Sequence, residues 1–153
     1  MFRGTQNGSV DAKGRLKLSV IVKRRLKQTY SQPEVFVTSL DGRTAKVYPI
    51  REWEEVERHL FGKAPGAEPL PDAAVRNRIL FHANRYGSEE RVDAQGRLLV
   101  PSPLRETAGM KGPVKIQWQT NHLLVMSEDQ FNEAVEANRL SQRDFELAAR
   151  LGL

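Results

Sequence analysis

An internal repeat limits what this chain can fold into. Residues 11–16, DAKGRL, recur as residues 93–98, DAQGRL. Each copy is followed by a short apolar segment typical of a strand, and then by a segment typical of a short helix. Repetition of such a block is the signature of related supersecondary units that stack on one another. We therefore expect the chain to contain two copies of one small unit.

Both halves continue with the pattern of a β-hairpin, in which two strand-like segments flank turn residues such as Asp41-Gly42. The segments are residues 35–40 and 45–48 in the first half, and residues 114–118 and 123–126 in the second. By contrast, residues 6–9, QNGS, are polar and predict a flexible segment before the first repeat.

Each hairpin leads into a predicted helix. Residues 49–61 carry apolar side chains at helical spacing. Ser127 and Gln130 form a capping-box pattern at the start of the helix in the second half. Shorter helices are expected over residues 20–27, capped by Ser19, and over residues 102–108.

These segments divide the chain into two units, residues 1–61 and 84–140. Residues 62–83 form a linker and a connecting helix, and residues 141–153 form an amphipathic helical tail. One hairpin with one helix buries little apolar surface and exposes strand edges. We therefore predict a β-dominated α+β fold in which the two units pair across a pseudo-two-fold axis, with the helices outside.

The repeated block predicts a rigid turn that aims cations outward. Asp11 suits the first position of a type I turn, where its carboxylate accepts a hydrogen bond from a backbone N–H two residues on. Gly14 supplies the positive φ that closes the turn, and Arg15 follows at the start of the next strand. The turn would thus hold Lys13 and Arg15 in fixed directions.

Two interpretations of the turn remain open and are compatible. In one, the pairs Asp11–Arg15 and Asp93–Arg97 only brace the turns, with Gly96 in the role of Gly14. In the other, Asp11 orients Arg15 toward guanine O6 and N7, while nearby cations contact phosphates. These cations, expected around the first turn, include Lys17, Lys23 and Arg24.

Composition favours a polyanionic partner and excludes several classes of site. The 153 residues include 24 Lys and Arg against 19 Asp and Glu, and there is no cysteine. Disulfides and thiolate metal sites are therefore excluded. The scattered histidines predict no metal or cofactor, and the absence of a catalytic motif predicts that the chain is not an enzyme. No apolar run suggests a membrane span or signal peptide, so we expect a cytoplasmic protein.

Several motifs in this order resemble the MraZ family, whose members are bacterial regulators of the division and cell-wall gene cluster. They are the two turns, residues 1–4 (MFRG), residues 47–53 (VYPIREW) and residues 98–105 (LLVPSPLR). The resemblance covers nearly the whole chain to about residue 140. It implies an AbrB-like swapped hairpin in each half, together forming a double-split β-barrel.

The resemblance also implies a function. It predicts a homo-oligomeric ring of about eight to twelve subunits that binds double-stranded DNA at short, G-rich direct repeats in a promoter. Repression would be the expected effect. The DNA-reading residue would be Arg15, with Lys13, Gly14 and Arg3 beside it. The alternative is a ring-forming scaffold or nucleoid-associated protein with weak sequence preference. Whether Arg97 contacts DNA or only braces an interface is left open.

Overall fold

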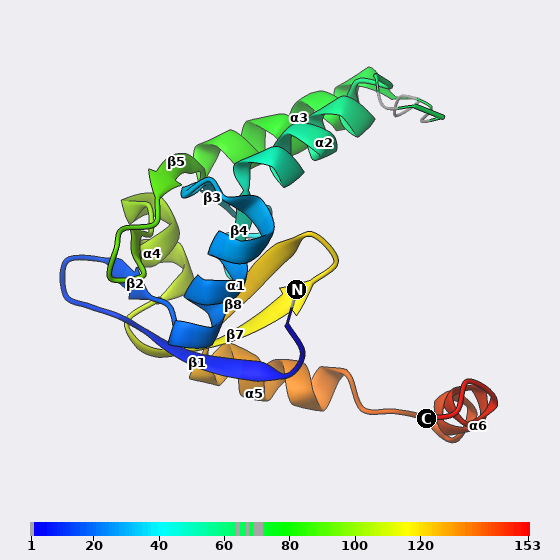
Figure 1. The fold of residues 1–153 in the computed structure, drawn as a ribbon. Coiled ribbons are helices and arrows are strands. Elements are labelled where there is room, and N and C mark those ends of the chain that lie inside the picture. The colour runs from blue at the N-terminus through cyan, green and yellow to red at the C-terminus, as the bar shows by residue number, and fades with distance from the viewer. Residues whose placement is uncertain (1, 64, 67, 69–71) are drawn as a thin grey trace.

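The computed structural model describes residues 2–63, 65–66, 68 and 72–153 (Figure 1). The strands are β1 (Thr5–Val10), β2 (Arg15–Lys17), β3 (Glu34–Thr38), β4 (Ala45–Pro49), β5 (Ser88–Arg91), β6 (Arg97–Leu99), β7 (Gly112–Gln119) and β8 (His122–Ser127). The helices are α1 (Val20–Tyr30), α2 (Ile50–Leu60), α3 (Ala73–Arg85), α4 (Ser102–Ala108), α5 (Glu128–Ala137) and α6 (Gln142–Arg150).

The strands form one antiparallel, nearly closed barrel. Their order is β5-β3-β4-β8-β7-β1-β2-β6 in a sheet of eight strands. The outer strands β5 and β6 are linked by the second turn, in which the Asp93 N–H donates to O of Arg97, the first residue of β6, at 2.9 Å. Closure leaves few strand edges exposed to other chains. The fold is a β-dominated α+β fold consistent with a double-split β-barrel, which confirms the predicted fold class.

The two halves exchange strands across a pseudo-two-fold axis. Strand β1 of the first half pairs with β7 of the second, and β5 of the second half pairs with β3 of the first. At the axis β2 pairs with β6, where Arg15 lies opposite Leu99 and Lys17 lies opposite Arg97. Each repeat therefore covers edges that it could not cover alone, as expected from its small size.

The core lies inside the barrel and on the axis. Leu16 and Leu98, the last residues of the two repeated blocks, pair with each other and are 0% and 1% exposed. Most apolar positions of the two predicted hairpins are also buried, including Val37 and Ile116, although Leu40 is exposed. Both hairpins are confirmed by the β3–β4 and β7–β8 pairings.

The prediction of a flexible segment at residues 6–9 is wrong, because this segment lies within β1. Its side chains alternate in burial, and Gly8 occupies an inward position. A Cβ at Gly8 would lie 2.7 Å from Ile116 Cδ1 and 3.0 Å from Lys17 O. Glycine at position 8 therefore leaves room for the neighbouring residues of β7 and β2. The polar residues around Gly8 obscure the strand pattern in the sequence.

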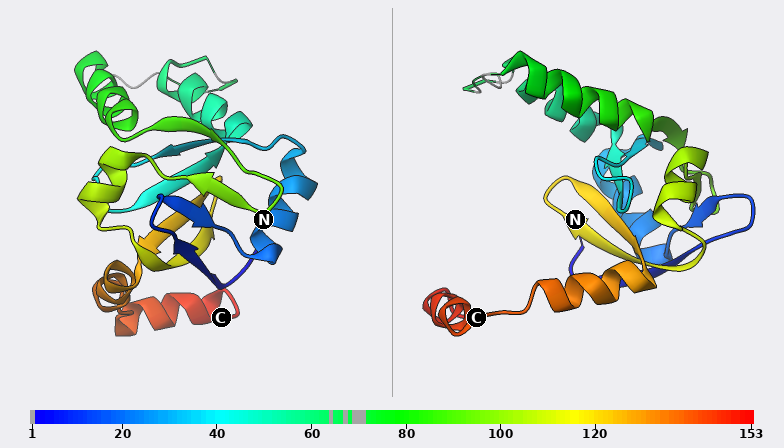
Figure 2. Two further views of the ribbon diagram at one scale, coloured as in Figure 1. Left: turned by 90° about the vertical axis from the view of Figure 1, so that its left-hand side faces the viewer. Right: turned by 180° about the vertical axis from the view of Figure 1, so that it is seen from behind.

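The helices lie around the barrel, and two regions extend away from it. Helices α2 and α3 lie side by side and project to the upper right in Figure 1, while α6 stands apart at the lower right. Figure 2 shows the same separation from behind. Across the residues that the structure describes, no helix combines the length and apolar character needed to cross a bilayer.

Candidate nucleic-acid interface

The first turn is held by its own aspartate. The backbone N–H groups of Lys13 and Arg15 each donate to Asp11 Oδ1 at 2.9 Å, and Arg15 Nε donates to Asp11 Oδ2 at 2.9 Å. Gly14 has a φ of +82° and donates its N–H to Asp11 O at 2.9 Å. The hydrogen bond from the Arg15 backbone is the largest influence that lowers the pKa of Asp11. The carboxylate therefore stays ionised and keeps the turn closed.

The second turn repeats this geometry. Asp93 Oδ1 accepts from the N–H groups of Gln95 and Arg97 at 2.9 Å each, and Arg97 Nε donates to Asp93 Oδ2 at 3.0 Å. Gly96 has a φ of +77°. The hydrogen bond from the Arg97 backbone likewise lowers the pKa of Asp93. The ion pairs considered from the sequence are thus present in both turns.

The two turns build one surface. The Leu18 N–H donates to Gly96 O at 2.8 Å, and the Val100 N–H donates to Gly14 O at 2.9 Å, so each turn is bonded to the segment that follows the other. Both turns lie on the left-hand side in Figure 1, which faces the viewer in the left panel of Figure 2. We call residues 11–15 and 93–97 together the turn face.

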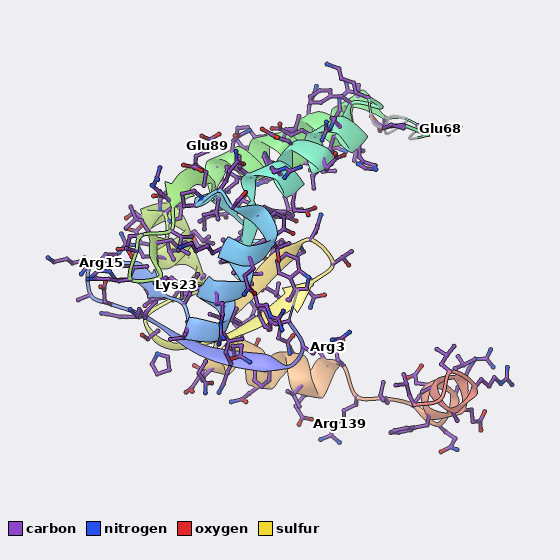
Figure 3. The ribbon with its side chains drawn as sticks, in the orientation of Figure 1. Arg3, Arg15, Lys23, Glu68, Glu89 and Arg139 are labelled. Carbon is purple, nitrogen blue, oxygen red and sulfur yellow. The ribbon has the colours of Figure 1, made fainter. Side chains whose placement is uncertain are left out.

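Arg15 presents its guanidinium to solvent. The side chain is 38% exposed, and Figure 3 shows Arg15 pointing outward at the left of the molecule. Asp11 binds only the Nε of Arg15, and the two terminal nitrogens of Arg15 have no hydrogen-bond partner among the described residues. Arg97 has the same arrangement and is 32% exposed. The aspartate therefore fixes the direction of each guanidinium and leaves the end of its fork available for a ligand.

Other predicted cations lie in different places. Lys13 is exposed in the first turn. Lys17 Nζ donates to Gln95 O and Lys23 Nζ donates to Ala94 O, so both lysines lie at the second turn rather than around the first. This follows from the antiparallel pairing of β2 with β6, which places the end of β2 beside the start of β6.

Two further predicted residues are farther from the turns. Arg24 is exposed on α1, where it lines a shallow groove together with Lys23 and Lys27. Arg3 is exposed and lies before β1, whereas the first turn lies at the other end of β1. A strand of this length separates its ends by about 17–20 Å. The structure therefore brings Lys13, Gly14 and Arg15 together but does not bring Arg3 to them.

Arg105 is a member of the site that the sequence interpretation missed. Its guanidinium lies where a Cβ on Gly14 would be, and its Nε donates to Val100 O at 2.9 Å. A side chain at position 14 would therefore displace the Arg105 guanidinium, besides straining the positive φ. Lys23 lies near Gly96, where a Cβ would be 3.2 Å from Lys23 Cδ. The signal was the repeat itself, because aligning its two copies places Arg105 opposite Lys23.

Comparison with known proteins identifies the family. The family model described as "MraZ protein, putative antitoxin-like" matches residues 87–151. A "Transcriptional regulator MraZ" of Acidobacterium capsulatum is 38% identical over 153 residues, with all of both chains covered, and one of Koribacter versatilis is 32% identical over the same length and coverage. The chain belongs to the MraZ family. Another member, from Thioalkalivibrio sulfidiphilus, is 35% identical over 131 residues, which cover 84% of this chain and 81% of the relative.

The turn face of this MraZ-family chain is cationic. Its two carboxylates, Asp11 and Asp93, are each engaged by an arginine. The positive groups on or against the turns are Lys13, Arg15, Lys17, Lys23, Arg97 and Arg105. Elsewhere in the described ranges, no group of three or more His, Cys, Asp or Glu is placed to hold a metal ion. The chemistry available at this face is therefore recognition of an anion by oriented donors.

Proposed function

We propose that this protein regulates transcription by binding duplex DNA through the turn face. Curated members of its family carry the name of a transcriptional regulator rather than of an enzyme. Within that role, we propose that it recognises short, G-rich direct repeats in a promoter and represses transcription from it. Binding to chromosomal DNA would place it in the cytoplasm, on the nucleoid.

The geometry of Arg15 carries this proposal. A guanidinium donates two parallel hydrogen bonds to guanine O6 and N7 in the major groove, and a contact of this kind discriminates against other bases by about 1–3 kcal/mol. Asp11 holds Arg15 Nε at 2.9 Å, so the side chain is already oriented before DNA binds. Pre-orientation reduces the conformational entropy that binding must remove. Arg97, oriented in the same way, is a candidate for a second base contact or for a brace.

The surrounding lysines and arginines supply affinity that does not depend on sequence. Lys13 is exposed beside Arg15, and Lys17, Lys23 and Arg24 extend the positive surface from the second turn onto α1. Each phosphate neutralised by such a group releases condensed counterions, which makes binding strong in dilute salt and weaker as salt increases. We assign these residues, and Arg3 at the periphery, to phosphate contacts.

Exposed apolar groups support self-assembly. Phe145 on α6 is 57% exposed and Leu151, the C-cap residue of this helix, is 80% exposed, and neighbouring exposed apolar groups can mark an interaction surface. We propose a ring of about eight to twelve copies. Direct repeats spaced about one turn of DNA apart would then meet the turn faces of successive subunits. Once one subunit binds DNA, the other subunits of the ring are held near the neighbouring repeats at a high effective concentration. Several weak contacts therefore give strong overall binding.

Replacing Arg15 tests the proposal. Arg15→Lys keeps the charge but loses the two-pronged donor, so preference for a G-rich repeat over scrambled duplex should fall about tenfold or more. Binding to scrambled duplex should change little. Arg15→Ala should lose the preference and weaken both, with native mass unchanged. Arg139→Ala, which removes an exposed arginine paired with Glu136 on α5, serves as the control.

Retention of full preference by Arg15→Lys would show that another group reads the bases. Equal binding of repeat and scrambled duplex by the unmodified protein would instead favour the alternative, a nucleoid-associated or scaffold ring with weak sequence preference.

A further inference from the structure

A cavity lies beside the turn face, between α1, β3 and the second turn. It has a volume of about 320 Å³, at the lower end of the range for small-molecule sites. Helix α1 contributes Lys23, Leu26, Lys27 and Tyr30 to its lining. Pro33, Val35 and Pro49 line it from β3, the segment before β3 and the end of β4, and Val92 to Ala94 line it from the second turn. Most of the cavity is therefore built from residues outside the proposed DNA contacts.

The cavity combines an apolar floor with a cationic edge. Leu26 and Val35 are buried in the core, and Val92 packs against it. Lys23 and Lys27 stand on one side of α1 and line the same space, and neither forms a salt bridge within the described ranges. Asp93 also lines the cavity, but its carboxylate accepts hydrogen bonds from Gln95 and Arg97. The charge left to meet a ligand is positive.

We propose that this cavity binds a small amphipathic anion. Its apolar body would lie against Leu26, Val35 and Val92, and its phosphate or carboxylate group would accept hydrogen bonds from Lys23 and Lys27. Charge-assisted bonds of this type are about twice as strong as neutral ones. The apolar floor favours a ligand with a hydrocarbon or ring portion over a bare inorganic ion.

The cavity forms beside α1 because the repeat is imperfect there. Helix α1 has 11 residues, whereas its counterpart α4 has 7 and ends before Gly109. The additional turn of α1 carries Lys27 and Tyr30 past the second turn and forms one wall. The pseudo-two-fold symmetry of the barrel is therefore broken where the cavity opens.

A ligand in this cavity would weaken DNA binding, an inference that rests on the proposed function. Lys23 lines the cavity and also donates to Ala94 O of the second turn, where we assign it to a phosphate contact. An anion held by Lys23 neutralises a charge that DNA would otherwise meet. The apparent dissociation constant for duplex DNA should rise about three- to tenfold, and the salt dependence should decrease by about one phosphate contact.

Three probes with one hydrocarbon chain test the cavity itself. Octyl phosphate and octanoate, below their micellar concentrations, and 1-octanol, below its solubility limit, are titrated into the full-length protein with methyl groups labelled for NMR. We expect saturable shifts at Leu26, Val35 and Val92. The two anions should bind about tenfold more tightly than the alcohol, and the comparison between them distinguishes a phosphate from a carboxylate ligand.

Lys27→Met is the decisive variant, because Lys27 is not among the residues that we assign to DNA contacts. The substitution keeps an apolar side chain of similar length and removes the positive charge. It should weaken anion binding about three- to tenfold and leave 1-octanol unchanged. Lys111→Met removes an exposed lysine in the second half and should change neither. Equal affinity of the anions and the alcohol, or shifts confined to exposed groups such as Leu140 and Leu151, would overturn the proposal.

The effect on DNA is measured separately. Octyl phosphate should lower the affinity of the unmodified protein for duplex DNA, and it should lower the DNA affinity of Lys27→Met by less. 1-Octanol should leave the DNA affinity of both proteins unchanged. Tight anion binding without any change in DNA affinity would overturn the regulatory part. A protein that binds no DNA even without ligand would instead refute the proposed function, while the NMR titration would still decide whether the cavity binds anions.

Discussion

At the scale of single residues, the site depends on one aspartate that performs two tasks. Asp11 Oδ1 closes the backbone turn, and Asp11 Oδ2 orients Arg15. The pKa of this carboxyl lies below its ordinary value of 3.8, so the ion pair persists at all physiological pH values. An exposed ion pair adds little to stability. Its value lies in holding the guanidinium in one direction.

Asp11→Asn separates these two tasks. The amide oxygen can still accept from the backbone, but the ionic bond to Arg15 Nε is lost. We expect the folded state to persist and the preference for the G-rich repeat to fall about three- to tenfold. Fluorescence anisotropy against repeat and scrambled duplexes measures this. Asp93→Asn makes the same change in the second turn, and an equal loss there would show that both turns read bases.

His122 gives a prediction for pH. Its ring stacks on Tyr48 with centroids 4.6 Å apart, and burial, aided by Lys46, lowers its pKa from 6.5 to about 4. A neutral, half-buried histidine stabilises the fold above pH 6.5, and this contribution is lost as pH falls from 6.5 toward 4. Because the ring is partly exposed, we expect the free energy of unfolding to decrease by roughly 1 kcal/mol from pH 7 to pH 5.

Urea unfolding at several pH values tests the role of His122. His122→Phe keeps the stacking on Tyr48 and cannot take up a proton. Its free energy of unfolding should therefore lack this decrease. An unchanged pH profile in the variant would assign the effect to another group.

At the scale of elements, the sequence predicts most of the fold but not the neighbours of each strand. The hairpins β3–β4 and β7–β8 and the helices after them follow from apolar periodicity and capping residues. Strand β1 was missed because four of its six residues are polar and Gly8 contributes no side chain. Lys17 and Lys23 were placed at the first turn because sequence proximity does not show that β2 and β6 run antiparallel.

Helix α6 carries the prediction for assembly. Phe145 on this helix and Leu151 at its C-cap are largely exposed, and we expect a second copy of the chain to cover them. Replacing both Phe145 and Leu151 with Glu should reduce the native mass of the assembly while the circular dichroism of the barrel persists. Arg143→Gln, on the opposite face of α6, is the control. A full-sized ring in the double variant would show that α6 is not part of the interface.

At the scale of the whole molecule, the pseudo-two-fold axis determines where the two turns lie. Exchange of β1 and β5 between the halves puts both turns on one side of the barrel, whereas α6 lies at a distance from them (Figure 1). The surface that we propose for DNA and the surface that we propose for assembly are thus separate, which would let several turn faces act together. The sequence predicted this pairing from the repeat, but it did not predict which cations would accompany each turn.

The most direct test of the account is a competition between two duplexes for the unmodified assembly. One contains G-rich direct repeats spaced by about one helical turn, and the other has the same composition in scrambled order, with salt held constant. We expect the repeat duplex to bind at least about tenfold more tightly, and we expect this preference to decrease when the spacing is changed by half a turn. Equal affinity for the two duplexes, or no binding to either in dilute salt, would contradict it.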